Sequence, residues 1–241
     1  MVAEPVASFH LTRQHAARAP LVLARLGTDR RALHHTPGLR FARLLGTGRG
    51  RTTSLSVDPS RSGMFAVWDD AAALDRFLRT SPVAARWRRA TEHYAVRLRL
   101  LTGGGRWRGV EPLAALAPVA ALAPVAAHRG PVAVLTRADV HARSWRAFLT
   151  AGRPVSDALS RAAGLLAVAG VGEAPLGRQA TFSLWRDAAA LEAFAYADPT
   201  HVAVMRRTRA EGWYGDELFA RFAPETIEGT WDGTDPLDTF G

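Results

Sequence analysis

His201 is the residue of this sequence whose type and position best suit a metal ligand. It follows Asp198-Pro199 in the predicted first turn of a helix, where Pro is tolerated because its missing N–H would have no intrahelical partner. The positive end of the helix dipole disfavours a charged imidazolium, so the ring stays neutral and can donate a lone pair to a metal ion. The alternative is a surface histidine near a helix N-terminus.

Further candidates lie on the same helix and on the preceding strand. Arg178 and Gln179 come between a turn rich in Gly and Pro and a predicted strand. An Arg at the end of a strand can bind a carboxylate with two hydrogen bonds or steady a bound oxygen species. Arg209 lies eight residues after His201, two helical turns along roughly the same face. Trp185 ends the strand, either as a core residue or as the wall of a binding site, and solvent-facing side chains are the alternative for both arginines.

The other seven histidines give weaker signals. His10 lies on a predicted strand, and because a strand residue of a barrel can face inward, it is the second choice as a metal ligand. His34 and His35 are adjacent in a predicted loop and are expected at the surface. His93 is placed near the end of a helix, where the dipole explains it without function.

An internal repeat determines which elements position these residues. Trp68–Phe77 aligns with Trp185–Phe194 with seven of ten residues identical, and a Pro follows each Trp by fourteen residues. Each copy later ends on a similar stretch, Gly105–Leu113 in the first and Gly229–Leu237 in the second. A fixed-distance repeat of this kind indicates an internal duplication.

The repeat also singles out His201. When the two Pro residues are aligned, the first copy has Ala84 where the second has His201. The shared scaffold therefore does not require this imidazole. A residue present in only one copy suggests a functional role that each barrel needs only once.

Each copy has the predicted order strand–helix–strand–strand–helix–strand, the split βαβ arrangement of ferredoxin-like folds. Two such units can pair their sheets into one α+β barrel, which buries the apolar faces and covers the sheet edges. The fold class is thus α+β, a tandem of ferredoxin-like units building a dimeric-α+β-barrel-type structure. The first copy has expected strands at 6–13, 39–45, 64–68 and 96–101 and helices at 14–33, 71–79 and 82–94. The second has expected strands at 131–137, 165–171, 179–185 and within 217–231, and helices at 144–162, 187–195 and 198–211, the first of these broken near 152–154.

The predicted domain boundaries follow from the repeat. Residues 1–113 form the first repeat and residues 131–241 the second, which carries the candidate site. Between them, residues 114–130 are rich in Ala and Pro and contain the pentad Ala-Leu-Ala-Pro-Val twice in tandem. Two Pro residues argue against one continuous helix, so this stretch is interpreted as a linker.

Composition narrows the class of protein. The chain has 241 residues, 48% of them hydrophobic, and no Cys, which excludes disulfides and Cys-held zinc or iron–sulfur centres. All 31 basic residues are Arg, and they are scattered, so the net charge of +9 is interpreted as a solvated basic surface and not as a nucleic-acid site. No apolar run is long enough to predict a membrane-spanning helix, and the N-terminal residues do not have the layout expected of a signal peptide. A cytoplasmic protein is expected, with peripheral membrane contact and the oligomeric state left open.

Four strings of residues resemble the spheroidene monooxygenase family, and the resemblance extends over roughly residues 39–237. That family is similar to the dimeric α+β barrel proteins and oxidises carotenoids with haem as cofactor. The resemblance implies haem and oxidative chemistry, with His201 as the iron ligand and with Trp185, Arg178 and Arg209 as haem contacts. The strings are Leu44–Gly50, Gly172–Gln179, Thr181–Trp185 and Arg206–Tyr214.

The predicted function is therefore that of a haem-dependent, monooxygenase-like enzyme acting on a small apolar molecule in the barrel pocket, a carotenoid or another secondary metabolite. Arg178 and Gln179 are the candidate catalytic residues, and an electron donor is left open as a partner. One alternative is a haem enzyme whose iron acts as a Lewis acid in dehydration or N-heteroatom chemistry. The other is a binding or scaffold protein that uses no cofactor.

Overall fold

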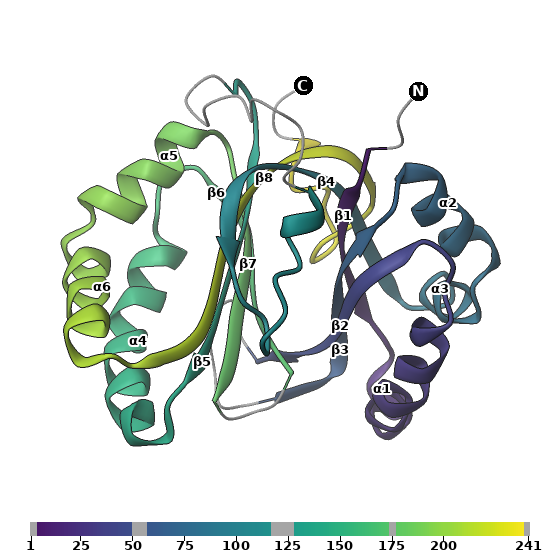
Figure 1. Cartoon of the computed structure of the whole chain (residues 1–241), viewed down its shortest axis with the longest axis horizontal. Coiled ribbons are helices and arrows are strands. Elements are labelled where there is room, and N and C mark those ends of the chain that lie inside the picture. The colour runs from purple at the N-terminus through teal and green to yellow at the C-terminus, as the bar shows by residue number, and fades with distance from the viewer. Residues whose placement is uncertain (1–3, 50–56, 117–127, 174–176, 239–241) are drawn as a thin grey trace.

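Eight antiparallel strands form a closed barrel with helices on two opposite sides (Figure 1). The structure is a computed structural model that describes residues 4–49, 57–116, 128–173 and 177–238. The expected linker, residues 114–130, lies mostly outside the described residues; its first residues form a short 3-10 helix, Ala114–Leu116. Within the described residues, no helix is long and apolar enough to cross a membrane.

The two halves of the chain have the same order of elements. The first half comprises β1 (Val6–Arg13), α1 (Ala19–His34), β2 (Leu39–Gly48), β3 (Val57–Trp68), α2 (Ala71–Thr80), α3 (Pro82–Trp87) and β4 (Glu92–Gly105). The second half comprises β5 (Val132–Val140), α4 (Trp145–Ser160), β6 (Leu165–Gly172), β7 (Arg178–Trp185), α5 (Ala188–Glu192), the π-helix η5 (Ala193–Ala197), α6 (Pro199–Glu211) and β8 (Tyr214–Gly229).

The strand order around the barrel is β1-β3-β2-β6-β7-β5-β8-β4. Each half therefore contributes four neighbouring strands in the same order, 4-1-3-2 in the first and 8-5-7-6 in the second. The halves join where β2 pairs with β6 and where β4 pairs with β8. Pairing at both edges leaves no strand unpaired, so the sheet closes on itself as expected for an α+β barrel.

The local registers also correspond. Trp68 pairs with Val6 on one side, and Trp185 pairs with Val132 in the same way. Asp70 and Asp187 each accept a hydrogen bond at 2.7 Å from the backbone N–H three residues on, which caps the following helix. Asp70 and Asp187 thus occupy equivalent N-cap positions in the two halves.

The interior of the barrel is filled by side chains. Phe9 and Phe182, from opposite halves, stack with their ring centroids 3.8 Å apart, and both also lie against Trp231. Leu45, Leu98 and many other buried residues complete this core. The expectation of an apolar substrate inside the barrel is therefore wrong, because small barrels of eight strands are just wide enough for side chains to fill.

Several predicted boundaries also differ. Helix α4 runs unbroken through Pro154, so the break expected near residues 152–154 is absent. Pro154 lies at an exposed position in the middle of this helix. Helix α3 ends at Trp87, so His93 lies near the start of β4 and not at a helix end. Strand β3 begins at Val57, and the segment 57–63, predicted as a polar connection, is part of the barrel.

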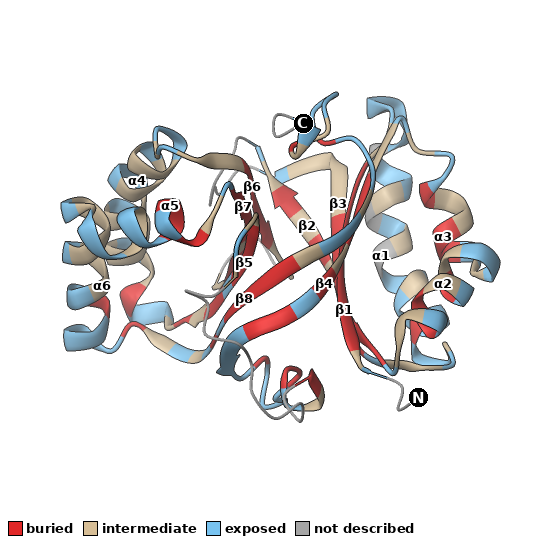
Figure 2. Ribbon diagram, turned by 90° about the horizontal axis from the view of Figure 1, so that it is seen from above, coloured by how far each residue is buried: buried red, intermediate tan, exposed pale blue. Residues whose placement is uncertain are grey.

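The layers between the sheet and the helices differ between the halves (Figure 2). In the first half, eleven buried apolar residues from β1, β3 and the three helices form one cluster. The corresponding cluster of the second half has six, all of them from β5, β7 and α5. No residue of α4 is buried, and Thr208 is the one buried residue of α6.

Candidate functional site

The outer face of the second-half sheet carries small side chains beneath α4 and α6. Successive strand residues point to opposite faces, so the residues that alternate with the barrel core point towards the helices. Thr136, Thr181 and Gly170 are paired across β5, β7 and β6 and form one row of this face. Ala138, Gln179 and Gly172 form the next row. We call these two rows the open face.

The same positions of the first half carry larger side chains. When the Trp68 and Trp185 registers are aligned, His10 stands where β5 has Thr136, and Met64 where β7 has Thr181. Leu44 likewise stands where β6 has Gly170. His10 and Met64 are almost completely buried, whereas Thr136 is exposed. The helices of the first half thus cover bulky residues. In the second half Thr136 is exposed and Thr181 and Gly172 are half-buried, whereas Gly170, Ala138 and Gln179 are buried.

His201 lies in the first turn of α6. Its backbone N–H donates to the Asp198 carboxylate at 2.8 Å, so Asp198 caps this helix. Its side-chain Nδ1 is 2.9 Å from the carbonyl oxygen of Ala195. A carbonyl only accepts, so Nδ1 carries the proton and donates it. The neutral ring therefore keeps its lone pair on Nε2, as in metal-binding histidines oriented by a backbone carbonyl.

The segment before His201 is a π-helix, η5, closed by the hydrogen bond from the Asp198 N–H to the Ala193 carbonyl at 3.1 Å. This wider turn brings the Ala195 carbonyl to the imidazole. Phe194 in the same turn packs between two aromatic rings, with its centroid 4.9 Å from His201 and 5.5 Å from Trp185. π-Helical turns within helices are frequent at functional sites.

The predicted site residues are thus only partly brought together. Trp185 and His201 lie on either side of Phe194. Arg178 and Gln179 are at the other end of β7, about 23 Å from Trp185 at about 3.3 Å per residue. Being adjacent on a strand, they point to opposite faces: Gln179 towards the helices, and Arg178 to the barrel side, with Nε 3.9 Å from Asp139. Arg209 is exposed near the end of α6.

Three residues near this site were not predicted from the sequence. Arg221 on β8 is 93–94% buried and donates to the Tyr196 hydroxyl at 3.0 Å. Its guanidinium also lies over the rings of Tyr196 and Phe219. Those two rings are 70% and 40% exposed, and Phe219 pairs with Thr136 of the open face. An exposed aromatic pair fixed by a buried Arg therefore borders the open face on the β8 side.

A metal ion held here would have one ligand from this chain. Within the described residues no three His, Asp or Glu side chains converge on one point, and the chain has no Cys. A single imidazole such as that of His201 would suffice to hold a haem iron, because the porphyrin ring supplies the other ligands. The donor set and the sparse burial of α4 and α6 thus fit haem, which His201 would hold.

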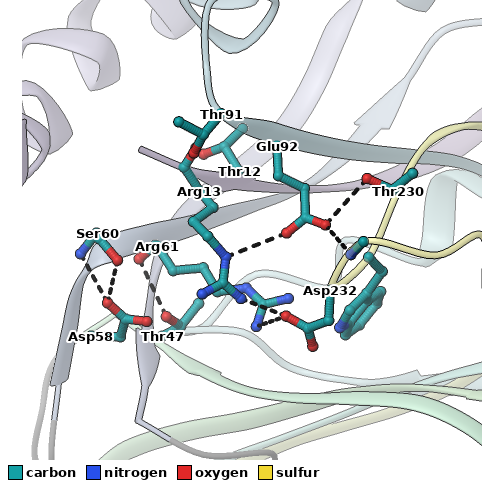
Figure 3. A network of polar contacts seen from close by, with 12 residues as sticks. Thr12, Arg13, Thr47, Asp58, Ser60, Arg61, Thr91, Glu92, Thr230 and Asp232 are labelled. Atoms are coloured by element: carbon teal, nitrogen blue, oxygen red, sulfur yellow. Dashed lines mark hydrogen bonds and ion pairs between the residues drawn. The ribbon is translucent and has the colours of Figure 1, made fainter. Parts of the chain in front are cut away.

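Charged side chains at the two ends of the barrel serve a different purpose. At one end, Arg13 pairs with Glu92 and Asp232, Arg61 pairs with Asp232 at 3.2 Å, and Glu92 accepts from the Gly233 N–H at 2.7 Å (Figure 3). These contacts fasten the turn that follows Trp231, which packs against the barrel core. The network therefore holds the turn that follows Trp231 against the end of the barrel core.

The opposite end of the barrel is closed in a similar way. Trp107 is buried and donates from Nε1 to Glu173 at 2.9 Å. The Gly109 N–H donates to Asp216 at 2.6 Å. In each case the closing turn of one half is fastened to a carboxylate of the other half. This pairing accounts for the charges at both ends without catalysis.

Known structures share this fold at low sequence identity. A crystal structure of aldoxime dehydratase aligns with 92% of this chain and 81% of its own at a TM-score of 0.59 and 15% identity. A second aldoxime dehydratase structure, in complex with butyraldoxime, covers 97% of this chain and 84% of its own at a TM-score of 0.61 and 13% identity. These similarities support the fold alone.

Sequence comparison is more informative. No protein-family model matches the chain. Spheroidene monooxygenase of Rubrivivax gelatinosus is 37% identical over 82% of this chain and 73% of the relative. Spheroidene monooxygenase of Rhodobacter capsulatus is 34% identical over 97% of this chain and 95% of the relative. With this identity over nearly the full length of both proteins, the chain belongs to the spheroidene monooxygenase family.

Proposed function

We propose that this protein is a haem-dependent oxygenase that inserts oxygen into an apolar polyene of the carotenoid class. The observation that carries the proposal is the hydrogen bond between His201 Nδ1 and the Ala195 carbonyl. It leaves Nε2 as the lone-pair donor, at a position where the first half has Ala84. When bound, haem supplies an iron centre for oxygen activation.

In this proposal the haem lies between the open face and the helices α4 and α6. Small side chains such as Thr136, Thr181 and Gly170 leave room for a flat ring, because no large residue from the sheet fills that space. The helices then obtain through the ring the packing that α4 does not have with the sheet. Trp185 and Phe194 add an apolar border next to His201.

The arginines keep narrower proposed roles. Arg209 follows His201 along α6 and is exposed, which suits a contact with a haem propionate at the edge of the site. Gln179 faces the helix layer and is the more suitable of the two predicted catalytic residues. Arg178 points to the barrel side of β7, so a role for it requires the ligand to reach the end of the strand. An electron-donating partner completes the proposal, since oxygen insertion consumes reducing equivalents.

The substrate class follows from the relatives, which are named for spheroidene, and from the border of the open face. Tyr196 and Phe219 present aromatic surface to solvent next to Thr136. Exposed apolar patches of this kind commonly mark ligand grooves. An elongated apolar molecule would lie along this border with one end near the iron.

We further propose that the chain arose by tandem duplication, with repeats at residues 1–113 and 131–241 joined by residues 114–130. The matched strand order, the matched capping Asp residues and the matched closing turns support this origin. Arg108 and Asp232 even share a positive φ, 53° and 54°, in those turns. A chain of this kind builds from one polypeptide what two half-length chains would build as a dimer.

The test is the absorption spectrum of His201→Ala, expressed with a haem precursor, beside the wild type. The variant is expected to lose the Soret band and the oxygenase activity, because it removes the proposed iron ligand. His10→Ala is the control, since His10 lies in the other half and faces a different helix layer.

Each possible outcome has a clear consequence. If His201→Ala retains an unchanged Soret band while His10→Ala loses it, the ligand assignment is wrong. If the wild type binds no haem, the enzymatic proposal fails and the binding or scaffold alternative takes its place. If the protein binds haem and converts an aldoxime or a related N-heteroatom substrate to its dehydration product, the Lewis-acid alternative holds. That alternative is supported by the shared fold alone.

A further inference from the structure

A second site lies in the first half, between the outer face of β1 and β3 and the helices α1 and α3. It is a cavity of about 40 Å³ that opens to solvent on one side. A water molecule needs about 10–15 Å³ measured in this way, so the cavity has room for about three waters or for a ligand of four or five non-hydrogen atoms. Its walls include His10, Thr12, Arg25, Ser62 and Arg86.

His10 presents an unused hydrogen-bond donor in this region. Ser8 Oγ accepts from Trp68 Nε1–H at 2.9 Å and lies 3.1 Å from His10 Nε2. An indole nitrogen only donates, so the Ser8 hydroxyl proton is free to be donated to His10 Nε2. With Ser8 as the donor to Nε2, the neutral imidazole carries its proton on Nδ1. That nitrogen is buried and has no hydrogen-bond partner within the described part of the chain, in a residue that is only 1% exposed.

The charges around the cavity are unbalanced. Arg18, Arg25 and Arg86 line it, whereas Asp29 is the one acidic residue in its lining. Asp29 forms an ion pair with Arg86, so three positive charges less one negative charge leave two positive charges unpaired there. The Nε of Arg86 is likewise buried without a partner among the described residues. Leaving buried donors unpaired is costly, and an acceptor-rich anion satisfies several of them at once.

We propose that this cavity binds a small oxyanion, a carboxylate or an inorganic phosphate, held by His10 Nδ1–H and by Arg25 and Arg86. The Thr12 and Ser62 side chains in the wall add neutral hydrogen-bonding groups. The site is too small for a porphyrin or a polyene and lies in the half opposite to His201. It is therefore independent of the proposed oxygenase site.

The experiment is a titration of the full-length protein with sodium acetate and, separately, with sodium phosphate, followed by calorimetry and by thermal unfolding at constant ionic strength. One of the two anions is expected to bind saturably at a single site and to raise the Tm as its concentration exceeds Kd. The two arms distinguish a carboxylate from a phosphate. Removing one charge-assisted hydrogen bond with Arg25→Gln is expected to weaken binding about tenfold or more.

Arg31→Gln is the matched control, because Arg31 is an exposed residue of the same helix that does not line the cavity. It is expected to keep the wild-type affinity. His10→Phe, which removes the Nδ1 donor, is expected to abolish binding, and Arg25→Gln gives an answer even if His10→Phe does not fold. The absence of saturable binding by either anion means that the cavity holds water only and overturns the proposal, as does an equal loss of affinity in Arg25→Gln and Arg31→Gln.

Discussion

The two halves of the barrel share a backbone but differ in how their helices meet the sheet. His10, Met64 and Leu44 lie in the first-half layer, and the corresponding residues of the second half are Thr136, Thr181 and Gly170. Smaller side chains on a matched backbone give the second-half helices less apolar surface to pack against, and the buried cluster there has six residues against eleven. The difference is consistent with the proposal that the second half, whose helix α6 carries His201, holds the haem, while the first half is more extensively packed and leaves room only for a small cavity.

The largest effect is expected when small residues of the second-half face are replaced by the larger residues at the corresponding first-half positions. The double variant Thr136→His, Thr181→Met is expected to weaken haem binding by more than about 100-fold, because its side chains occupy the volume that the ring needs. The measurement is a haem titration followed by absorbance, which does not depend on turnover. Thr102→Met, at an exposed position of β4, is the control and is expected to bind haem normally; normal binding by the double variant would show that the open face is not the haem site.

A truncation at equivalent positions compares the packing of the two layers. Met64→Ala is expected to lower the free energy of unfolding by about 2–5 kcal/mol, because it opens a cavity in a fully buried cluster. Thr181→Ala is expected to cost less than about 1 kcal/mol in the protein without haem, because its side chain packs against little. Urea unfolding of the haem-free proteins measures both. Equal costs would mean that the second-half layer is packed as tightly as the first.

The pH dependence of stability should also be specific to the first half. Burial lowers the pKa of His93 from 6.5 to about 4, and the charge of nearby Arg88 adds to the effect. Burial also lowers the pKa of His10, with a smaller contribution from His93. Between pH 6.5 and 4 the unfolded chain therefore binds protons that the folded chain does not, so stability falls as the pH falls through this window. His93 alone contributes up to about 3 kcal/mol of that loss.

Hydrogen exchange at pH 7 and pH 4.5 locates this effect. The amides of β1 and β4 are expected to lose protection first, because both histidines lie on those strands. His93→Gln removes the titrating group. It is expected to reduce the pH dependence of the free energy of unfolding by the amount that His93 contributes. A uniform loss of protection in both halves would assign the acid sensitivity to some other group.

The smallest expected effect concerns what the halves have in common. Asp70→Ala and Asp187→Ala each remove a helix cap with the same geometry, and each should cost about 1 kcal/mol of stability. Thermal unfolding of the two variants measures the difference between them. If the two variants lose clearly different amounts of stability, the two helices contribute unequally to the stability of the fold despite their matched capping geometry.

The sequence predicted the scaffold well because the repeat preserves it in residue identities. The two Trp residues, the capping Asp residues and the helix-opening Pro residues recur at the same spacing and mark the same places in both halves. The differences at the candidate site lie on β1, β2 and β3 and on β5, β6 and β7, at positions outside the stretch of clear identity. Assigning His10 to the position of Thr136 requires the strand register, which alternation alone does not provide.

Two other features could not be derived from the sequence pattern, for identifiable physical reasons; the catalytic roles of Arg178 and Gln179 stay predictions. Apolar alternation gives each strand two faces, but it does not say which face binds a ligand, so the packed barrel interior was taken for the binding pocket. Arg178 and Gln179 were grouped as one catalytic pair although adjacent strand residues face opposite sides. Arg221 was missed because its strand was located only to within residues 217–231, and its burial depends on contacts with Tyr196 and Phe219.

The closure of the barrel has a consequence for synthesis of the chain. Strand β4 is the partner of β8, which is made more than a hundred residues later, along a ladder from Tyr94–Gly229 to Gly105–Leu218. Domains generally fold during synthesis from the N-terminus onwards, yet here the first half has an open edge at β4 until β8 has been made. A growing chain therefore exposes that edge for the time needed to make more than a hundred residues, and chaperone binding to nascent chains should concentrate on β4.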